Sequence, residues 1–132
     1  QKSNYLRKYI PPWSVSLPAQ LAAISALNNP DYYQNKYRII HFEREKLSQG
    51  LTDIGFKVFP GVANFLLTTL PIDSNYSSSS FITESRNLGL FVRDAENMGV
   101  TLTNKSVRFA IRSSEENNRM LSLVRKIILK DQ

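Results

Sequence analysis

Two arginines, Arg93 and Arg108, are the residues of this sequence best suited to chemistry, because each belongs to a short apolar run typical of a strand. On a rigid strand, a guanidinium fork can bind a carboxylate or a phosphate through two parallel hydrogen bonds. In the run 107–112, apolar residues alternate with Arg108, Ala110 and Arg112, which predicts a strand with one buried face. Arg108 then lies on the opposite, outer face. Neighbouring strands would bring both guanidiniums to one rim, where they match a small ligand with two anionic groups.

Both arginines also have a simpler interpretation. Exposed strand faces are routinely charged, so Arg108 and Arg112 can simply cover the outer face of a sheet. Arg93 can pair on the surface with Asp94 or Glu96, which follow it closely. Spacing alone does not separate these interpretations from an anion clamp.

Asn64 is the third candidate for ligand binding, because it is a lone amide in the otherwise apolar run 62–70. If this side chain is buried, it must find hydrogen-bond partners. Backbone groups at a bulge are the commoner partners, and a ligand is the alternative.

Motifs for catalysis and metal binding are missing from the sequence. It has no phosphate-binding glycine pattern, no nucleophile elbow and no HExxH spacing. The absence of cysteine excludes thiolate metal sites, and the single histidine, His41, is expected to be an ordinary packed or half-exposed helix residue. Every lysine lies in a polar context, which disfavours the lowered pKa that a Schiff-base lysine needs. We therefore predict binding groups, no catalytic residue and no metal.

Size and composition fit one globular domain, with 132 residues, 42% hydrophobic and 21% charged. The net charge of +6 raises nucleic acid as a partner, but the basic residues are spread out and alternate with acidic ones. A nucleic-acid footprint would gather them on one face among aromatic residues, so we expect no nucleic-acid partner. No apolar run approaches the roughly 20 residues of a membrane span, and the lack of cysteine favours a cytoplasmic location.

Breakers and periodicity predict the elements that position these residues. A first helix is expected from about Ser16, with Pro18 in its first turn, and a second from Pro30, capped by Asn29 and ending near Gly50. The second helix carries an apolar stripe of residues spaced by three, four and seven, namely Tyr33, Tyr37, Ile40, Leu47 and Leu51.

The second half of the chain predicts a hairpin of strands 56–59 and 62–70, the latter central. A polar loop at 73–80 precedes a short helix at 81–88 that ends at Gly89. Strands at 90–93 and 107–112 follow, and Ser113 with Glu116 forms the capping box of a last helix. That helix is expected to bury Met120, Leu121, Val124, Ile127 and Ile128. The order ααββαββα predicts an α+β fold with a small, largely antiparallel sheet of three or four strands packed against helices.

Five motifs occur in an order that resembles the C-terminal small domain of the fold-type I, pyridoxal-phosphate-dependent aminotransferases of class I/II. They read PWSV, GVANFLL, FVRD, VRFAIRS and EN, at 12–15, 61–67, 91–94, 107–113 and 116–117. The resemblance covers nearly the whole chain and is closest to the branch that holds histidinol-phosphate aminotransferase and threonine-phosphate decarboxylase. The first motif and the end of the fourth resemble the decarboxylase slightly more.

The resemblance implies a role for each arginine. Arg108 maps onto the arginine that binds the substrate α-carboxylate, and Arg93 onto the one that binds the substrate phosphate. The stretch 96–102 between them departs from the family pattern, which affects the role of Arg93 more. Pyridoxal phosphate and its Schiff-base lysine belong to a large domain missing from this chain. Residues 1–15 would then be the hinge from that domain and 16–132 the small domain.

Two functions follow as expectations. The first is the substrate-clamping domain of an aminotransferase or amino-acid decarboxylase in amino-acid biosynthesis, acting on a phosphorylated amino acid or amine. The resemblance implies that this domain is inactive alone and works with its own large domain in a homodimeric parent enzyme. The alternative is a free-standing α+β module that binds a ligand or a protein without catalysis.

Overall fold

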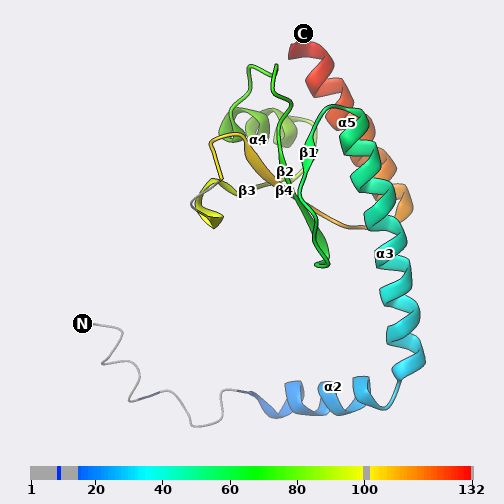
Figure 1. Cartoon of the computed structure of the whole chain (residues 1–132). Coiled ribbons are helices and arrows are strands. Elements are labelled where there is room, and N and C mark those ends of the chain that lie inside the picture. The colour runs from blue at the N-terminus through cyan, green and yellow to red at the C-terminus, as the bar shows by residue number, and fades with distance from the viewer. Residues whose placement is uncertain (1–8, 10–14, 100–101, 132) are drawn as a thin grey trace. The chain divides into compact units, whose positions relative to one another are not determined.

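The computed structural model describes residues 9, 15–99 and 102–131 (Figure 1). The chain divides into two compact units, residues 1–37 and 38–132. The predicted hinge segment, residues 1–15, lies outside the described residues except for Tyr9 and Val15. No helix in the described ranges has the length and apolar character that crossing a membrane requires.

The order of elements along the chain confirms the predicted one. The helices are α2 (Leu17–Leu27), α3 (Pro30–Asp53), α4 (Ser78–Asn87) and α5 (Ser114–Asp131), with a 3-10 turn η2 (Glu96–Met98). The strands are β1 (Lys57–Val58), β2 (Phe65–Thr69), β3 (Arg93–Asp94) and β4 (Ser106–Ala110). They form one antiparallel sheet in the order β1-β2-β4-β3, so β2 and β4 are central. The predicted α+β fold is confirmed.

One face of the sheet carries the hydrophobic core. Along β2 and β4, Leu66, Val107 and Phe109 are at most 2% exposed, whereas the alternating residues Phe65 and Arg108 are half-buried. The core residues come from this face, from α3, α4 and α5, and from the segments between them. They are Leu47, Leu51, Phe56, Leu66, Leu70, Phe81, Ile82, Val92, Val107, Phe109, Met120, Val124, Ile127 and Ile128. The opposite face of β2 and β4 therefore remains available for ligand contact.

The first two helices begin where the sequence predicts. Ser16 is the N-cap of α2 and accepts a hydrogen bond from the Ala19 N–H at 3.4 Å. The start of α3 at Pro30 is also confirmed. Among the described residues no helix N–H donates to Asn29 Oδ1, so the predicted side-chain cap is not found, and Asn29 Nδ2 donates to the Ser25 carbonyl at 2.8 Å.

The predicted end of α3 at Gly50 is wrong, because the helix continues to Asp53. A Cβ atom on Gly50 would lie 2.5 Å from Leu121 Cδ1, so this glycine allows α3 and α5 to approach closely. The residue that terminates the helix is Gly55, two positions after Asp53, where φ is +99°. The Phe56 N–H donates to Leu51 and the Gly55 N–H to Thr52, the two hydrogen bonds of a Schellman motif.

The serine run predicted as loop forms the start of α4. Ser77 is the N-cap, and its side chain accepts from the Ser80 N–H while the Ser80 hydroxyl accepts from the Ser77 N–H. Two serines thus replace the usual Ser and Glu of a capping box. The predicted end at Gly89 is confirmed, with φ +73° and a second Schellman pair to Arg86 and Ser85.

The strands are shorter than predicted. The run 62–70 becomes a strand only at Phe65, and the strand predicted at 90–93 is β3, which starts at Arg93. The stripe of α3 is also shorter, since Leu47 and Leu51 are fully buried whereas Tyr33 and Tyr37 are 37% and 58% exposed. On α5, four of the five predicted core residues are buried and Leu121 is half-buried.

Candidate anion-binding site

Arg93 and Arg108 lie directly opposite each other on adjacent strands. They are register partners in the antiparallel pair of β3 and β4. Because directly opposed residues of an antiparallel pair project their side chains to the same face, the two arginines share one side of the sheet. Arg108 alternates with the buried Val107 and Phe109, so this side is the one opposite the core. The structure thus brings together the two residues that the sequence singled out.

Phe65 supports the guanidinium of Arg108 from the neighbouring strand. The Arg108 Cζ lies 4.5 Å from the centre of the Phe65 ring, a cation–π contact. Both side chains are half-buried, so part of the guanidinium stays accessible. Contact with the ring restricts where the guanidinium can lie, which favours bidentate binding of a planar carboxylate.

Arg93 lies at the start of β3 with its side chain exposed. Within the described residues it forms no ion pair with Asp94 or Glu96, since the Asp94 carboxylate instead accepts the Glu96 N–H at 2.9 Å. Arg93 also lines a hollow of about 500 Å³ beside α4, together with Thr83, Arg86 and other residues. The hollow is lined by the two arginines and by one carboxylate, that of Asp94, so its formal charge is +1 and only weakly favours an anion.

Asn64 precedes β2, and its side chain is exposed. The expected buried amide in a central strand is therefore not found. Its backbone carbonyl accepts the Ile111 N–H at 2.9 Å and extends the pairing of β2 with β4 by one bond. Binding of a ligand by the Asn64 side chain stays a prediction.

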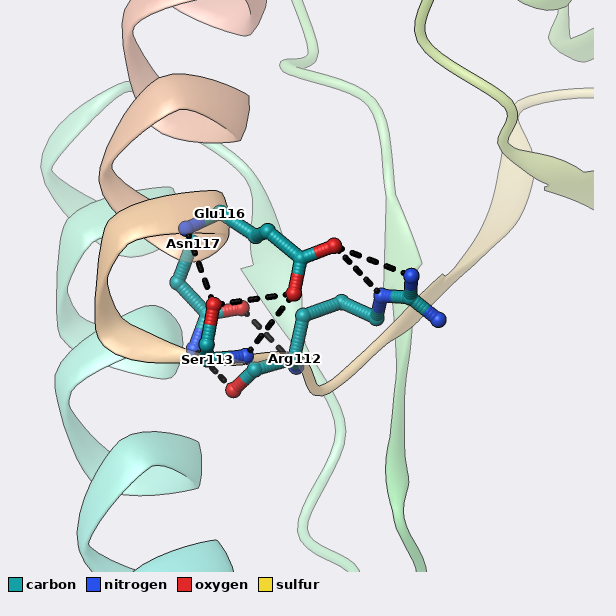
Figure 2. Close-up of polar contacts among 4 residues, drawn as sticks. All are labelled: Arg112, Ser113, Glu116 and Asn117. Atoms are coloured by element: carbon teal, nitrogen blue, oxygen red, sulfur yellow. Dashed lines mark hydrogen bonds and ion pairs between the residues drawn. The ribbon is translucent and has the colours of Figure 1, made fainter.

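The loop between β4 and α5 is closed by a polar cluster of four residues, shown in Figure 2. The Ser113 hydroxyl donates to Glu116 Oε2 at 2.8 Å and accepts the Glu116 N–H at 3.3 Å, which confirms the predicted capping box. Arg112 Nη2 pairs with Glu116 Oε1 at 2.9 Å. The Ser113 hydroxyl and the Arg112 guanidinium, in that order, lower the pKa of Glu116 below its usual value. Arg112 is therefore engaged at the helix start.

Three buried polar residues were not identified from the sequence, namely Glu43 and Arg44 of α3 and Asn117 of α5. A signal was present for Arg44, because the apolar stripe of α3 runs through positions 40, 47 and 51. The spacing of three and four assigns position 44 to the same buried face. A charge at a stripe position indicates a buried polar contact.

Neither a metal nor a covalently bound aldehyde cofactor fits the described residues. They contain no group of three His, Cys, Asp or Glu side chains that could hold a metal ion. A lysine that captures pyridoxal phosphate needs a buried or cationic surrounding. The most buried described lysine, Lys105, donates instead to the carbonyls of Ile72 and Ser74 at 3.1 and 2.8 Å.

Comparison with known proteins identifies one family. The model of the family "Aminotransferase class I and II" matches residues 3–124. Histidinol-phosphate aminotransferase 2 of Archaeoglobus fulgidus is 32% identical over 117 residues, which is 88% of this chain and 32% of that protein. The chain therefore spans about a third of the length of the curated relatives it matches.

Solved structures share the fold. Histidinol-phosphate aminotransferase from Clostridium acetobutylicum superimposes with a TM-score of 0.79 at 28% identity, covering 91% of this chain and 35% of that one. L-threonine-O-3-phosphate decarboxylase from Porphyromonas gingivalis gives a TM-score of 0.65 at 20% identity, covering 89% and 36%. At that identity the second likeness concerns the fold alone.

Proposed function

Because this chain belongs to the aminotransferase class I and II family, we propose that it is the substrate-clamping small domain of a pyridoxal-phosphate-dependent enzyme. Arg108 binds the substrate α-carboxylate and Arg93 binds the substrate phosphate. The observation that carries the proposal is the register pairing of these two arginines on the open face of the sheet. Asn64, at the entrance to β2, contributes a further polar contact to the substrate.

The clamp works through geometry and charge. The guanidinium of Arg108 lies over the Phe65 ring, and this contact prepares it for two parallel hydrogen bonds to a carboxylate. Arg93 lies one strand away at an exposed edge, next to Arg86 of α4, where a more distant and more highly charged group would bind. Fixing both ends of a substrate orients the bonds at its α-carbon relative to the rest of the enzyme.

The substrate class follows from the two clamps. A molecule with a phosphate and a carboxylate, such as a phosphorylated amino acid, matches both clamps, whereas a phosphorylated amino alcohol has no carboxylate and matches only the phosphate clamp. Relatives of 28–32% identity are histidinol-phosphate aminotransferases, whereas the decarboxylase shares only the fold. This favours transamination of a histidinol-phosphate type substrate over decarboxylation.

The remaining two thirds of the parent enzyme supply the cofactor site. The relatives are about three times as long as this chain, and its described lysines lack the surroundings that cofactor capture needs. We therefore infer that residues 16–132 are the small domain, that residues 1–15 lead from a large domain, and that the chain is inactive alone. The parent enzyme is proposed to be a homodimer.

The first test is the mass of the native polypeptide, detected with an antibody against this chain. We expect about three times 15.1 kDa, in proportion to the relatives. A native mass of 15.1 kDa would instead support a free-standing binding module and overturn the enzyme proposal.

Two substitutions in the native polypeptide then test the clamps separately. Arg108→Lys keeps the charge but loses the fork, so kcat/KM for a substrate with an α-carboxylate should fall roughly 10- to 100-fold. Arg93→Ala should raise KM for histidinol phosphate and leave KM for histidinol, which lacks the phosphate, little changed. Arg125→Ala, at an exposed position of α5, is the control. Equal effects of Arg93→Ala on both substrates would contradict the phosphate role.

A further inference from the structure

Glu43 and Arg44 are adjacent on α3 and are both buried, with 6% and 9% of their surface exposed. They contact two different segments of the chain. Arg44 contacts the loop that leads into β2, and Glu43 contacts α5 close to the loop that leaves β4. These two loops lie at the same end of the sheet, next to the contact between Phe65 and Arg108.

Arg44 holds the chain just before Phe65. Its Nη2 donates to the Val62 carbonyl at 2.6 Å and to the Ala63 carbonyl at 2.7 Å, and its Nε donates to Ala63 at 3.0 Å. Its Nη1 lies 2.7 Å from His41 Nδ1, which must therefore accept, since a guanidinium only donates. All three guanidinium nitrogens of Arg44 therefore donate hydrogen bonds. The planar group holds the Val62 and Ala63 carbonyls, which precede Phe65 by three and two residues.

Glu43 supports the other loop through Asn117. Asn117 Nδ2 donates to Glu43 Oε2 and to the Arg112 carbonyl, both at 3.0 Å, and Asn117 Oδ1 accepts the Arg112 N–H at 3.0 Å. The two loops are joined directly by the hydrogen bond from the Ile111 N–H to the Asn64 carbonyl at 2.9 Å. One helix therefore holds both loops that flank the clamp.

This arrangement is costly for stability. Burying a charge is unfavourable unless a charged partner or several hydrogen bonds compensate it. Within the described residues neither Glu43 nor Arg44 has an ion-pair partner, and their recorded contacts are neutral carbonyls, an imidazole and an amide. The four hydrogen bonds of Arg44 compensate its burial, whereas Glu43 has the one from Asn117, so each side chain is tied to the loop segment that it contacts.

We propose that Arg44, with Glu43, is a positioning residue that sets the substrate affinity of Arg108. Arg44 fixes the entrance to β2, the fixed entrance places the Phe65 ring, and the ring sets the plane of the Arg108 guanidinium. The link to substrate rests on the proposed function, whereas the link from Arg44 to Arg108 depends on structure alone. Two measurements therefore test the two links independently.

The structural link is tested by NMR on the 132-residue chain, through the Nε–Hε signal of Arg108. A guanidinium above an aromatic ring has this proton shifted upfield, and Phe65→Leu gives the position of the signal without the ring. Arg44→Met and Arg44→Lys should each move the signal most of the way to that position, because methionine donates no hydrogen bond and lysine lacks the planar fork that holds both carbonyls and His41 at once. Arg38→Met, at an exposed position of the same helix, should leave it unchanged. Glu43→Gln should also preserve it, since an amide oxygen still accepts from Asn117.

The two arginine variants keep the inference falsifiable if one of them fails to fold. A folded Arg44→Lys chain with the Arg108 signal at its original position would overturn the structural link. In the native polypeptide, Arg44→Lys should raise KM for the carboxylate-bearing substrate about tenfold with a smaller change in kcat, because the clamp is misplaced rather than removed. The proposed function would be overturned, with the positioning intact, by one combination of results. In that combination Arg44→Lys moves the Arg108 signal, but neither Arg44→Lys nor Arg108→Lys changes KM for the carboxylate-bearing substrate.

Discussion

Glu116, at the start of α5, is expected to make the free energy of unfolding depend on pH. Its carboxylate accepts from the Ser113 hydroxyl at 2.8 Å and pairs with Arg112 at 2.9 Å, and these contacts lower its pKa in the folded chain. A carboxyl group with a lowered folded-state pKa stabilises the fold fully above its unfolded pKa. That contribution is lost as the pH falls through the ordinary value of 4.5 towards the lower folded value.

The prediction concerns the free energy of unfolding of Glu116→Gln, measured by urea denaturation between about pH 7 and pH 3. The variant should be less stable than the original chain at neutral pH, and the difference should shrink as the pH falls. Glu115→Gln, in the same helical turn, controls for the loss of a negative charge near the helix N-terminus. A difference that stays constant across the range would contradict the role of the Ser113 and Arg112 contacts.

Among single residues, the sequence predicts those whose role follows from alternation or spacing. Arg108 is predicted because it alternates with apolar residues, and the Ser113–Glu116 capping box because its spacing of three is diagnostic. The position of Asn64 could not be predicted, because an apolar run does not show where strand pairing begins. The burial of Glu43 depends on Asn117, which lies 74 residues away in the chain. No local pattern contains a contact of that kind.

At the scale of elements, most of the fold was predictable from periodicity and from helix caps. The order of elements and the central place of β2 follow from apolar patterns and turn residues, whereas the central place of β4 was not predicted. The errors came from glycine and serine, whose positions have more than one physical explanation. Gly50 was predicted to end α3, whereas it lies inside the helix against the Leu121 side chain, and the serine run around Ser78 is helical because it caps itself.

Gly55 and Gly89 end α3 and α4 with positive φ, and their replacement tests that explanation. Gly55→Ala and Gly89→Ala should each lower the free energy of unfolding by about 1–2 kcal/mol, because a Cβ atom disfavours left-handed backbone. Gly89 isolates the backbone effect, since an added Cβ would meet no atom within 4 Å, whereas at Gly55 it would also contact Pro71 at 3.4 Å. Gly61→Ala is the matched control, with no positive φ and no atom within 4 Å. Equal stabilities of Gly61→Ala and Gly89→Ala in thermal or urea unfolding would refute the assignment.

At the scale of the whole molecule, the described residues include groups suited to substrate binding but no lysine suited to capturing a cofactor. The two guanidiniums that we propose to bind anions lie on the open sheet face, whereas a lysine in surroundings suited to capturing an aldehyde cofactor is not found among the described residues. The chain spans about a third of its curated relatives, and we propose that the two tasks fall on different parts of a longer polypeptide. The resemblance could be drawn from five short motifs because they keep their order, even though no single one is specific.

The last prediction tests this division directly with pyridoxal phosphate itself. The 132-residue chain is incubated with the cofactor, reduced with borohydride and analysed by peptide mass spectrometry. We expect low labelling spread over the exposed lysines, because they lack the buried or cationic surroundings that activate a lysine for capture of an aldehyde. Lys105 should be labelled least, since its ammonium is already bonded to the carbonyls of Ile72 and Ser74. In the native polypeptide, the same procedure should label one lysine stoichiometrically, outside these 132 residues. Stoichiometric labelling of a single lysine within this chain would show that it holds its own cofactor site and would overturn the division of tasks.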